Sequence, residues 1–383
     1  MRILTLLLHD ERFSGWTVRD KVFRRHFSIQ CLRFCRSNGW EPLLYTFHQN
    51  VKSKRVYCLH HGVVKVFPVK FRFPPFQRFG NDHNPEEVMD EALKDSPDLV
   101  HFHHYYLFSF PYTAIFVKEK LKRPLAVQLH GYNNGFLRKW LYTPCILSLK
   151  RADVIIYSYK PEEALYLKLG LKERAVRIPF PGVNPEFFKR KKKAKSSRLL
   201  YVGRIPKPER AFGEKSPYTL LYLLRSLLAL NSHVTLDVVG DGPGLLHCKR
   251  LARLLGVENH VVFHGYVPHS EVCRHYQVAA LTIVPVQVYD VDGWFDGSVQ
   301  ESLACGTPVA AFKASPKTGF LGTYGFMLSK DPEKAAEEVS TILESPEMAY
   351  EMADEGSRFV HEMCTHEKVA YKMREAWEAA AKK

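Results

Sequence analysis

The segment Asp292–Pro308, DGWFDGSVQESLACGTP, contains the residue types and spacing best suited to bind an anion. Ser298 is a typical helix N-cap, and Gly306 followed by Pro308 is a typical helix end. A helix start presents free backbone N–H groups and the positive end of the helix dipole, which together favour a phosphate group. The spacing Ser298-x-x-Glu301 is equally that of a capping box, in which Glu301 only reaches back to its own helix start. The local residues leave both interpretations open.

Two cations follow the apolar run Leu199–Val202. Gly203-Arg204 comes directly after this run, and Lys215 precedes the next helical segment. A departing nucleoside diphosphate accumulates negative charge, and two fixed cations can neutralise that charge without a metal ion. An arginine or lysine alone is more often solvated, so the strand–turn context is what makes this pair a candidate. The later run VVGDGPG does not have the glycine spacing of a dinucleotide-binding loop.

Histidines and cysteines are the remaining candidates for chemistry. His101, His103 and His104 in VHFHHYY offer either a metal cluster or side chains that line an acceptor site, and we prefer the second interpretation. The eight cysteines include no Cys-x-x-Cys pair, and Cys31 and Cys35 have no second pair to accompany them. This spacing argues against a zinc site and favours buried free thiols in a reducing cytoplasm.

Short apolar runs alternate with helical segments in both halves of the chain, which predicts two parallel sheets covered by helices. In the first half we expect strands at Ile3–Leu8, Leu43–Phe47, Leu99–Phe102, Leu125–Leu129 and Val154–Tyr157. In the second half we expect strands at Leu199–Val202, Val234–Val239, Val261–Phe263, Ala280–Val284 and Pro308–Phe312. Ligands of such sheets bind beyond the carboxyl ends of the strands, and two facing sheets would form a cleft.

The 383 residues are too many for one ordinary core, so we expect two domains. The charged segment Phe188–Ser197, FKRKKKAKSS, is typical of a linker. We therefore expect an N-terminal Rossmann-like domain at 1–187, a linker at 188–197 and a C-terminal Rossmann-like domain at 198–365. A final helix at 366–383 is expected to pack back on the first domain. The fold class is α/β, and no apolar run approaches the roughly 18 residues that a membrane span needs.

The stretch Gln300–Ala311, QESLACGTPVAA, resembles the signature helix of the family-four retaining glycosyltransferases, which have a B-type fold of two facing Rossmann-like domains. The resemblance implies that Glu301 grips the ribose hydroxyls of a nucleotide-sugar donor. The family has another Glu eight positions earlier, where this chain has Gly293, so either Asp292 or Asp296 would replace it at the donor sugar. The same resemblance implies that the helix start contributes donor-binding residues, namely Gly297, Ser298 and Val299.

The same family resemblance extends to the other motifs. It implies that Arg204 and Lys215 hold the donor diphosphate, with Lys207 as the competitor of Lys215 because the family's lysine is displaced here by an insertion. It implies that Val267 and Pro268 hold the base, largely through their backbone. Three further roles in the first half are implied: Gly15 in a glycine-rich loop at the diphosphate, His130 in VQLHGY at the transferred sugar, and His103 and His104 on the acceptor side.

The net charge of +15 is concentrated in the first half, where residues 1–190 contain 31 Lys and Arg against 17 Asp and Glu. Helix 18–36 and the segment Lys65–Arg78 combine cations with aromatic residues. They are either a solvated helix with a basic loop or a surface that docks on an anionic membrane. No pattern of a nucleic-acid-binding module is present, so nucleic acid is not expected as a partner.

These patterns and the resemblance lead to one expected function. We expect a cytoplasmic enzyme, peripheral on the membrane face, that needs no metal ion or other cofactor. It would transfer a hexose from a UDP-, GDP- or ADP-sugar to a lipid-linked or polysaccharide acceptor with retention of configuration. Two alternatives remain: a catalytically inactive scaffold that binds nucleotide sugars, favoured by the missing first Glu, and a nucleotide-sugar epimerase of the same fold.

Overall fold

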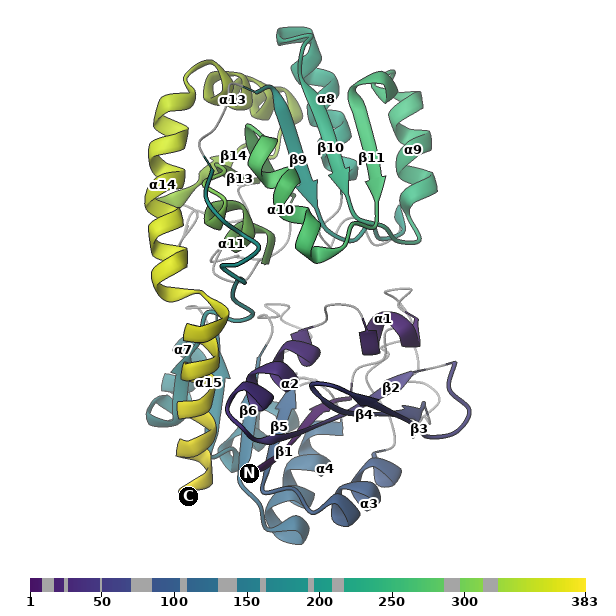
Figure 1. Cartoon of the computed structure of the whole chain (residues 1–383), viewed down its shortest axis with the longest axis vertical. Helices are drawn as coiled ribbons and strands as arrows, with labels where there is room; N and C mark the ends of the chain where they lie inside the picture. The colour runs from purple at the N-terminus through teal and green to yellow at the C-terminus, as the bar shows by residue number, and fades with distance from the viewer. Residues whose placement is uncertain are drawn as a thin grey trace. The chain divides into compact units, whose positions relative to one another are not determined.

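The computed structural model describes most of the chain and divides it into two compact units (Figure 1). One unit contains Met1–Ile178 together with Val369–Lys383, and the other contains Pro179–Lys368. The described residues are 1–8, 17–23, 27–48, 50–69, 85–103, 109–129, 143–158, 163–191, 196–208, 217–285, 297–312 and 323–383. Among them, no helix combines the length and the hydrophobicity that crossing a bilayer would require.

The first unit is built on an eight-stranded sheet with the order β3-β4-β2-β1-β5-β6-β7-β8. Neighbouring strands are parallel except for the β3–β4 pair. The strands are β1 (Arg2–Leu7), β2 (Glu41–His48), β3 (Arg55–Leu59), β4 (Gly62–Pro68), β5 (Leu99–His103), β6 (Leu125–Gln128), β7 (Val154–Tyr157) and β8 (Ala175–Arg177).

Helices cover both faces of this sheet, because alternate residues of its central strands are buried on opposite sides. One face packs on five helical elements: α3 (Glu86–Asp95), α4 (Ser109–Ile115), η2 (Phe116–Leu121), α6 (Thr143–Ser148) and η3 (Leu149–Arg151). The other face packs on α1 (Val18–Phe23) and α2 (Phe27–Ser37). Shorter elements are α7 (Glu163–Lys168) and η5 (Lys172–Arg174).

The second unit is a six-stranded parallel sheet with the order β11-β10-β9-β12-β13-β14. This is the doubly wound order, which reverses direction between β9 and β12. The strands are β9 (Arg198–Val202), β10 (Thr235–Val239), β11 (Val261–Gly265), β12 (Leu281–Val284), β13 (Val309–Phe312) and β14 (Phe326–Leu328).

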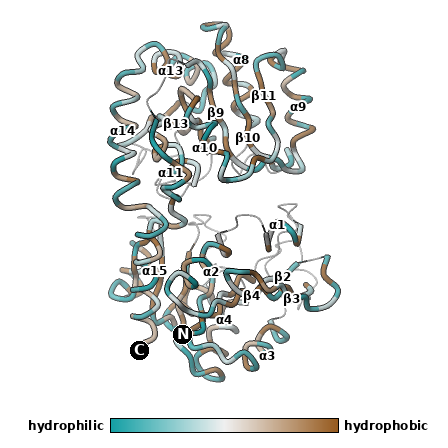
Figure 2. The backbone as a smooth tube through the Cα atoms, in the orientation of Figure 1, coloured by the Kyte–Doolittle hydropathy of each residue, from teal (hydrophilic) through white to brown (hydrophobic). Residues whose placement is uncertain are grey.

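Two separate apolar clusters form the core of the second unit, one on each face of its sheet. The first involves α8 (Tyr218–Leu230), α9 (Leu245–Leu254) and α13 (Pro332–Glu344), and the second involves α10 (His269–Val278), α11 (Gly297–Ala304) and α14 (Pro346–Met363). The short η7 (Glu258–His260) precedes β11. Figure 2 shows α8 as largely hydrophobic and α14 as mainly hydrophilic, and one face of α8 is buried through its leucines.

All ten expected strands are present, but the sequence did not reveal β3, β4, β8 or β14. The most consequential difference concerns Lys65, which we grouped with a basic and aromatic surface segment. Residues 65–68 belong instead to β4, which lies between β2 and β3, and both Lys65 and Phe67 are buried. These two side chains are therefore part of the core and not of a basic and aromatic surface segment.

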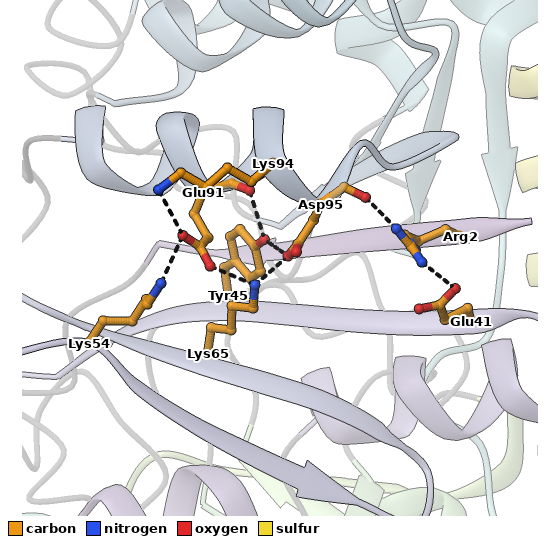
Figure 3. Close-up of polar contacts among 8 residues, drawn as sticks. All are labelled: Arg2, Glu41, Tyr45, Lys54, Lys65, Glu91, Lys94 and Asp95. Carbon is orange, nitrogen blue, oxygen red and sulfur yellow. Dashed lines mark hydrogen bonds and ion pairs between the residues drawn. The ribbon is translucent and has the colours of Figure 1, made fainter.

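Lys65 is buried because two carboxylates of α3 neutralise it (Figure 3). Its Nζ lies 2.7 Å from Glu91 Oε1 and 2.6 Å from Asp95 Oδ2. Lys54 adds an ion pair to the other oxygen of Glu91 at 2.8 Å, and the Tyr45 hydroxyl donates to Asp95. Burial opposes ionisation of Glu91, but the hydrogen bonds from Lys54 and Lys65 outweigh it and lower the pKa to about 2. This ionic cluster fastens α3 to the sheet.

Parts of the expected linker and of the last helix have specific packing. Phe188 is fully buried in the second unit, and Arg190 forms an ion pair with Asp354 of α14. The helix α15 (His366–Ala381) buries Trp377, whose ring lies 5.9 Å from that of Trp40 and 5.8 Å from that of His101. From Val369 onward this helix belongs to the first unit.

Candidate functional site

The expected donor-binding residues that the structure describes all follow the carboxyl ends of three strands of the second sheet. Gly203-Arg204 follows β9, Val267-Pro268 follows β11, and α11 is the next described element after β12. Because these strands are parallel, their carboxyl ends meet at one edge of the sheet. The reversal of strand order lies between β9 and β12, which is where such sheets bind ligands. Arg204 follows β9, and Glu301 lies in α11, the next described element after β12.

The glycine-rich loop after β10 holds the Gly203-Arg204 loop in place. The Gly203 N–H donates to the Val239 carbonyl at 3.0 Å, and the Ile205 N–H donates to the Asp241 carbonyl at 2.9 Å. A Cβ atom at Gly240 would lie only 1.9 Å from the Gly203 carbonyl oxygen, so a larger residue does not fit. Gly240 therefore serves close packing between two loops and thereby fixes the backbone beside Arg204.

Glu301 is a buried carboxylate held by two side chains of α10. His269 Nε2 lies 2.8 Å from Glu301 Oε1, and the Tyr276 hydroxyl donates to Glu301 Oε2 at 3.1 Å. Only 6% of Glu301 is exposed. An ionised carboxylate only accepts hydrogen bonds, so a ligand group that suits it is a hydroxyl donor. A cis-diol such as that of a ribose offers two such donors.

The start of α11 differs slightly from expectation. The helix begins at Gly297, so Ser298 lies in the first turn rather than at the N-cap. Ser298 and Val299 are buried, and Val299 packs in the apolar cluster that also contains Phe188. Gly297 lies beside the Glu301 carboxylate, because a Cβ atom there would be 3.8 Å from Oε1. The helix start and Glu301 are thus close enough to contact one ligand.

The remaining donor-side candidates differ in exposure. Val267 is half-buried, Pro268 is exposed directly before α10, and Arg204 is half-buried. The Tyr201 hydroxyl donates to the Arg204 carbonyl at 2.6 Å, which orients this turn. Lys207 is exposed, and Lys215 lies outside the described residues. The choice between these two lysines therefore stays open.

Several expected site residues lie outside the described residues, and their roles stay predictions: Gly15, His104, His130, Lys215, Asp292 and Asp296. His103 is described and is fully buried at the end of β5, with its Nε2 3.7 Å from Cys31 Sγ. Its acceptor-side role also stays a prediction.

His269 and Tyr276 are site residues that the sequence reasoning missed. They lie seven positions apart in HSEVCRHYQV, which places them on one face of a helix. This seven-residue spacing could have indicated them. The helix that carries it starts directly after Val267-Pro268 and precedes β12, the strand that comes before Glu301 in the chain. A partly buried pair, His264 Nε2 with Asp237 Oδ1 at 2.6 Å, links β11 to β10.

Two protein-family models match consecutive parts of the chain. The model of Glycosyltransferase Family 4 matches residues 29–187, and the model of Glycosyl transferases group 1 matches residues 183–359. The chain therefore belongs to glycosyltransferase family 4, as the signature helix indicated.

Curated relatives align with part of the chain. A GDP-mannose-dependent alpha-(1-6)-phosphatidylinositol monomannoside mannosyltransferase of Mycolicibacterium smegmatis is 26% identical over 252 residues, covering 61% of this chain and 64% of the relative. A D-inositol 3-phosphate glycosyltransferase of Thermobispora bispora is 30% identical over 196 residues, covering 45% of this chain and 43% of the relative. These alignments span less than two thirds of the relatives' own length.

Solved structures match nearly the whole chain. Sucrose-phosphate synthase from Thermosynechococcus elongatus superposes with a TM-score of 0.70 at 17% identity, covering 98% of each chain. Anabaena HepE in complex with UDP-glucose superposes with a TM-score of 0.66 at 16% identity, covering 99% of this chain and 100% of that one. The expected fold class, α/β with two Rossmann-like domains of the B type, is confirmed.

Proposed function

We propose that this protein is a retaining glycosyltransferase that moves a hexose from a nucleotide sugar to a lipid-linked or glycan acceptor. The observation that carries the proposal is the buried Glu301 carboxylate at the reversal point of the second sheet, held by His269 and Tyr276. A carboxylate is an acceptor that suits the hydroxyls of a ribose, and Arg204 follows the adjacent strand on the other side of that point.

In this proposal the chain's own residues divide the work. Glu301 binds the ribose hydroxyls, and the backbone around Val267 and Pro268 holds the base. Arg204 and Lys215 neutralise the diphosphate as its charge grows on leaving, so no metal ion is required. His130 assists at the transferred sugar, and Gly15 lets the backbone approach the diphosphate. The resemblance to a family of retaining enzymes supports retention of configuration.

The comparisons support the substrate classes. The mycobacterial relative is named for GDP-mannose as donor and for a phosphatidylinositol monomannoside as acceptor, and HepE was solved with UDP-glucose. We therefore propose a nucleotide-sugar donor and an acceptor that carries a lipid or a growing glycan. The donor nucleotide is the first variable that an assay must scan.

We also propose that the first unit docks on an anionic membrane face in the cytoplasm. Exposed arginines on α1 and α2 support this, namely Arg19, Arg33 and Arg36. The described cysteines are all free thiols, which fits a reducing compartment. Lys65 does not contribute, because it is buried in the ionic cluster with Glu91 and Asp95.

The experiment is a turnover panel. Purified protein is incubated with UDP-, GDP- and ADP-hexoses and with phosphoinositide, glycolipid and oligosaccharide acceptors, and products are identified by mass spectrometry. We expect a glycosylated acceptor with one preferred nucleotide and, by NMR, the anomeric configuration of the donor. Binding of a nucleotide sugar without turnover would favour the inactive scaffold, and conversion of the free nucleotide sugar would favour the epimerase.

A further inference from the structure

A second cluster of reactive side chains lies inside the first unit, on the sheet face that α2 covers. His101 and His103 alternate along β5 and therefore point to the same face, where His103 pairs in register with Gln128 of β6. Cys31 of α2 approaches them, and all of these side chains are fully buried. On the opposite face of the same strands, Val100 and Phe102 pack in the apolar core.

The three potential ligand atoms are as close together as metal ligands are. The Cys31 sulfur lies 3.7 Å from His103 Nε2, and each of Cys31, His101 and His103 offers an atom within 4.8 Å of the others. With a zinc–sulfur bond of about 2.3 Å, a zinc–nitrogen bond of about 2.0 Å and a tetrahedral angle, sulfur and nitrogen would lie about 3.5 Å apart. The pair already has this separation.

Polar atoms without partners point to something that is bound there. Neither ring nitrogen of His101 has a hydrogen-bond partner among the described residues, although His101 is 0% exposed. Each such buried group costs about 1–3 kcal/mol if it stays unsatisfied.

We propose that Cys31, His101 and His103 bind a structural zinc ion, and that the amide oxygen of Gln128 is the neighbouring oxygen ligand. The amide oxygen of Gln128 lies 4.0 Å from the Cys31 sulfur. Binding deprotonates Cys31, and the thiol proton leaves to solvent as the zinc–sulfur bond forms. The ion would take up the lone pair of one His101 ring nitrogen and link α2 to β5, so its role is to stabilise the first unit.

Neither family membership nor the proposed donor reaction requires this site. The absence of Cys-x-x-Cys pairs argued against zinc from the sequence. A site built from one cysteine and two histidines of a distant strand contains no such pair, so that pattern does not detect it. Because the ligands are fully buried, we expect the ion to enter during folding and to resist brief chelation of the folded protein.

The test is the metal content of the full chain, purified from cells grown with added zinc. We expect about one zinc ion per wild-type chain after dialysis against EDTA, and a loss of most of it in Cys31→Ala. Cys35→Ala is the matched control, since Cys35 is buried one turn further along the same helix but is outside the cluster. Protein from cobalt-grown cells should show a thiolate-to-cobalt charge-transfer band, which Cys31→Ala lacks and Cys35→Ala keeps.

A wild-type chain that carries neither zinc nor cobalt would overturn the proposal and leave buried water as the partner of His101. Zinc content in Cys31→Ala equal to that of the wild type would also overturn it. If Cys31→Ala does not fold, the zinc content of His101→Gln is measured in its place. The zinc content of the wild type decides by itself whether the site binds zinc. None of these readouts depends on transferase activity, so their failure is distinct from failure of the proposed function.

Discussion

At the scale of single residues, Glu301 shows how far the sequence could be read. Its position three residues after Ser298 left a helix cap and a ligand-binding carboxylate equally open. The structure adds His269 and Tyr276, which come from another helix and which local spacing cannot connect to Glu301. A tertiary contact between α10 and α11 therefore carried the missing information.

The first prediction concerns Tyr276, which donates to the Glu301 carboxylate. Tyr276→Phe removes one hydrogen bond to a charged acceptor, worth about 1.5–3 kcal/mol. We expect urea denaturation to show a loss of about 1–2 kcal/mol in unfolding free energy, and calorimetry to show donor affinity reduced several-fold. Tyr222→Phe is the control, because Tyr222 is exposed on α8 and should change neither quantity. If Tyr276→Phe and Tyr222→Phe had the same unfolding free energy and the same donor affinity, Tyr276 would not be a site residue.

At the scale of elements, the sequence was most informative where apolar periodicity was unbroken. It revealed the ten central strands for that reason. It did not reveal β4, because Lys65 and a proline interrupt the apolar run and imitate a surface segment. The residues that neutralise Lys65, Glu91 and Asp95, are 26 and 30 positions away, so only the folded chain shows that a buried lysine is acceptable there.

The ionic cluster around Lys65 gives the second prediction. Lys65→Met leaves Glu91 and Asp95 without their shared buried cation, and we expect it to destabilise the protein by about 3 kcal/mol. Lys94→Met is the control, since Lys94 also approaches Glu91, at 3.8 Å, but its side chain is 73% exposed. Its effect should stay below about 0.5 kcal/mol in the same denaturation experiment. If Lys65→Met left the free energy of unfolding unchanged, α3 would be held by apolar packing alone.

At the scale of the whole molecule, the reaction's independence of metal ions is the third prediction. Arg204 and Lys215 are proposed to take the role that a divalent cation has in other transferases. We expect transfer activity to be unchanged after treatment with EDTA, as measured by product formation in the turnover assay. Activity that falls on chelation and returns with Mg²⁺ or Mn²⁺ would show that a metal ion assists the diphosphate.

The uneven charge of the chain gives the fourth prediction. The first 190 residues contain 31 Lys and Arg against 17 Asp and Glu, so this half should bind anionic vesicles. We expect co-sedimentation with phosphatidylglycerol vesicles that weakens as the Debye length falls from about 10 Å at 0.1 M salt to about 3 Å at 1 M. Equal sedimentation with neutral phosphatidylcholine vesicles would count against an electrostatic surface.

The central claim is that Glu301 binds the ribose of the donor. The most direct measurement is a calorimetric cycle with wild type and Glu301→Gln, each titrated with the preferred nucleoside diphosphate and with its 2′,3′-dideoxy form. Two hydroxyl bonds to a buried carboxylate predict that Glu301→Gln weakens binding of the ordinary nucleotide by about 10- to 100-fold. The dideoxy nucleotide should bind weakly and equally to both proteins, and Glu271→Gln, an exposed change on α10, should match the wild type throughout. If Glu301→Gln bound the ordinary nucleotide as tightly as the wild type, or weakened both nucleotides equally, the ribose assignment would be wrong.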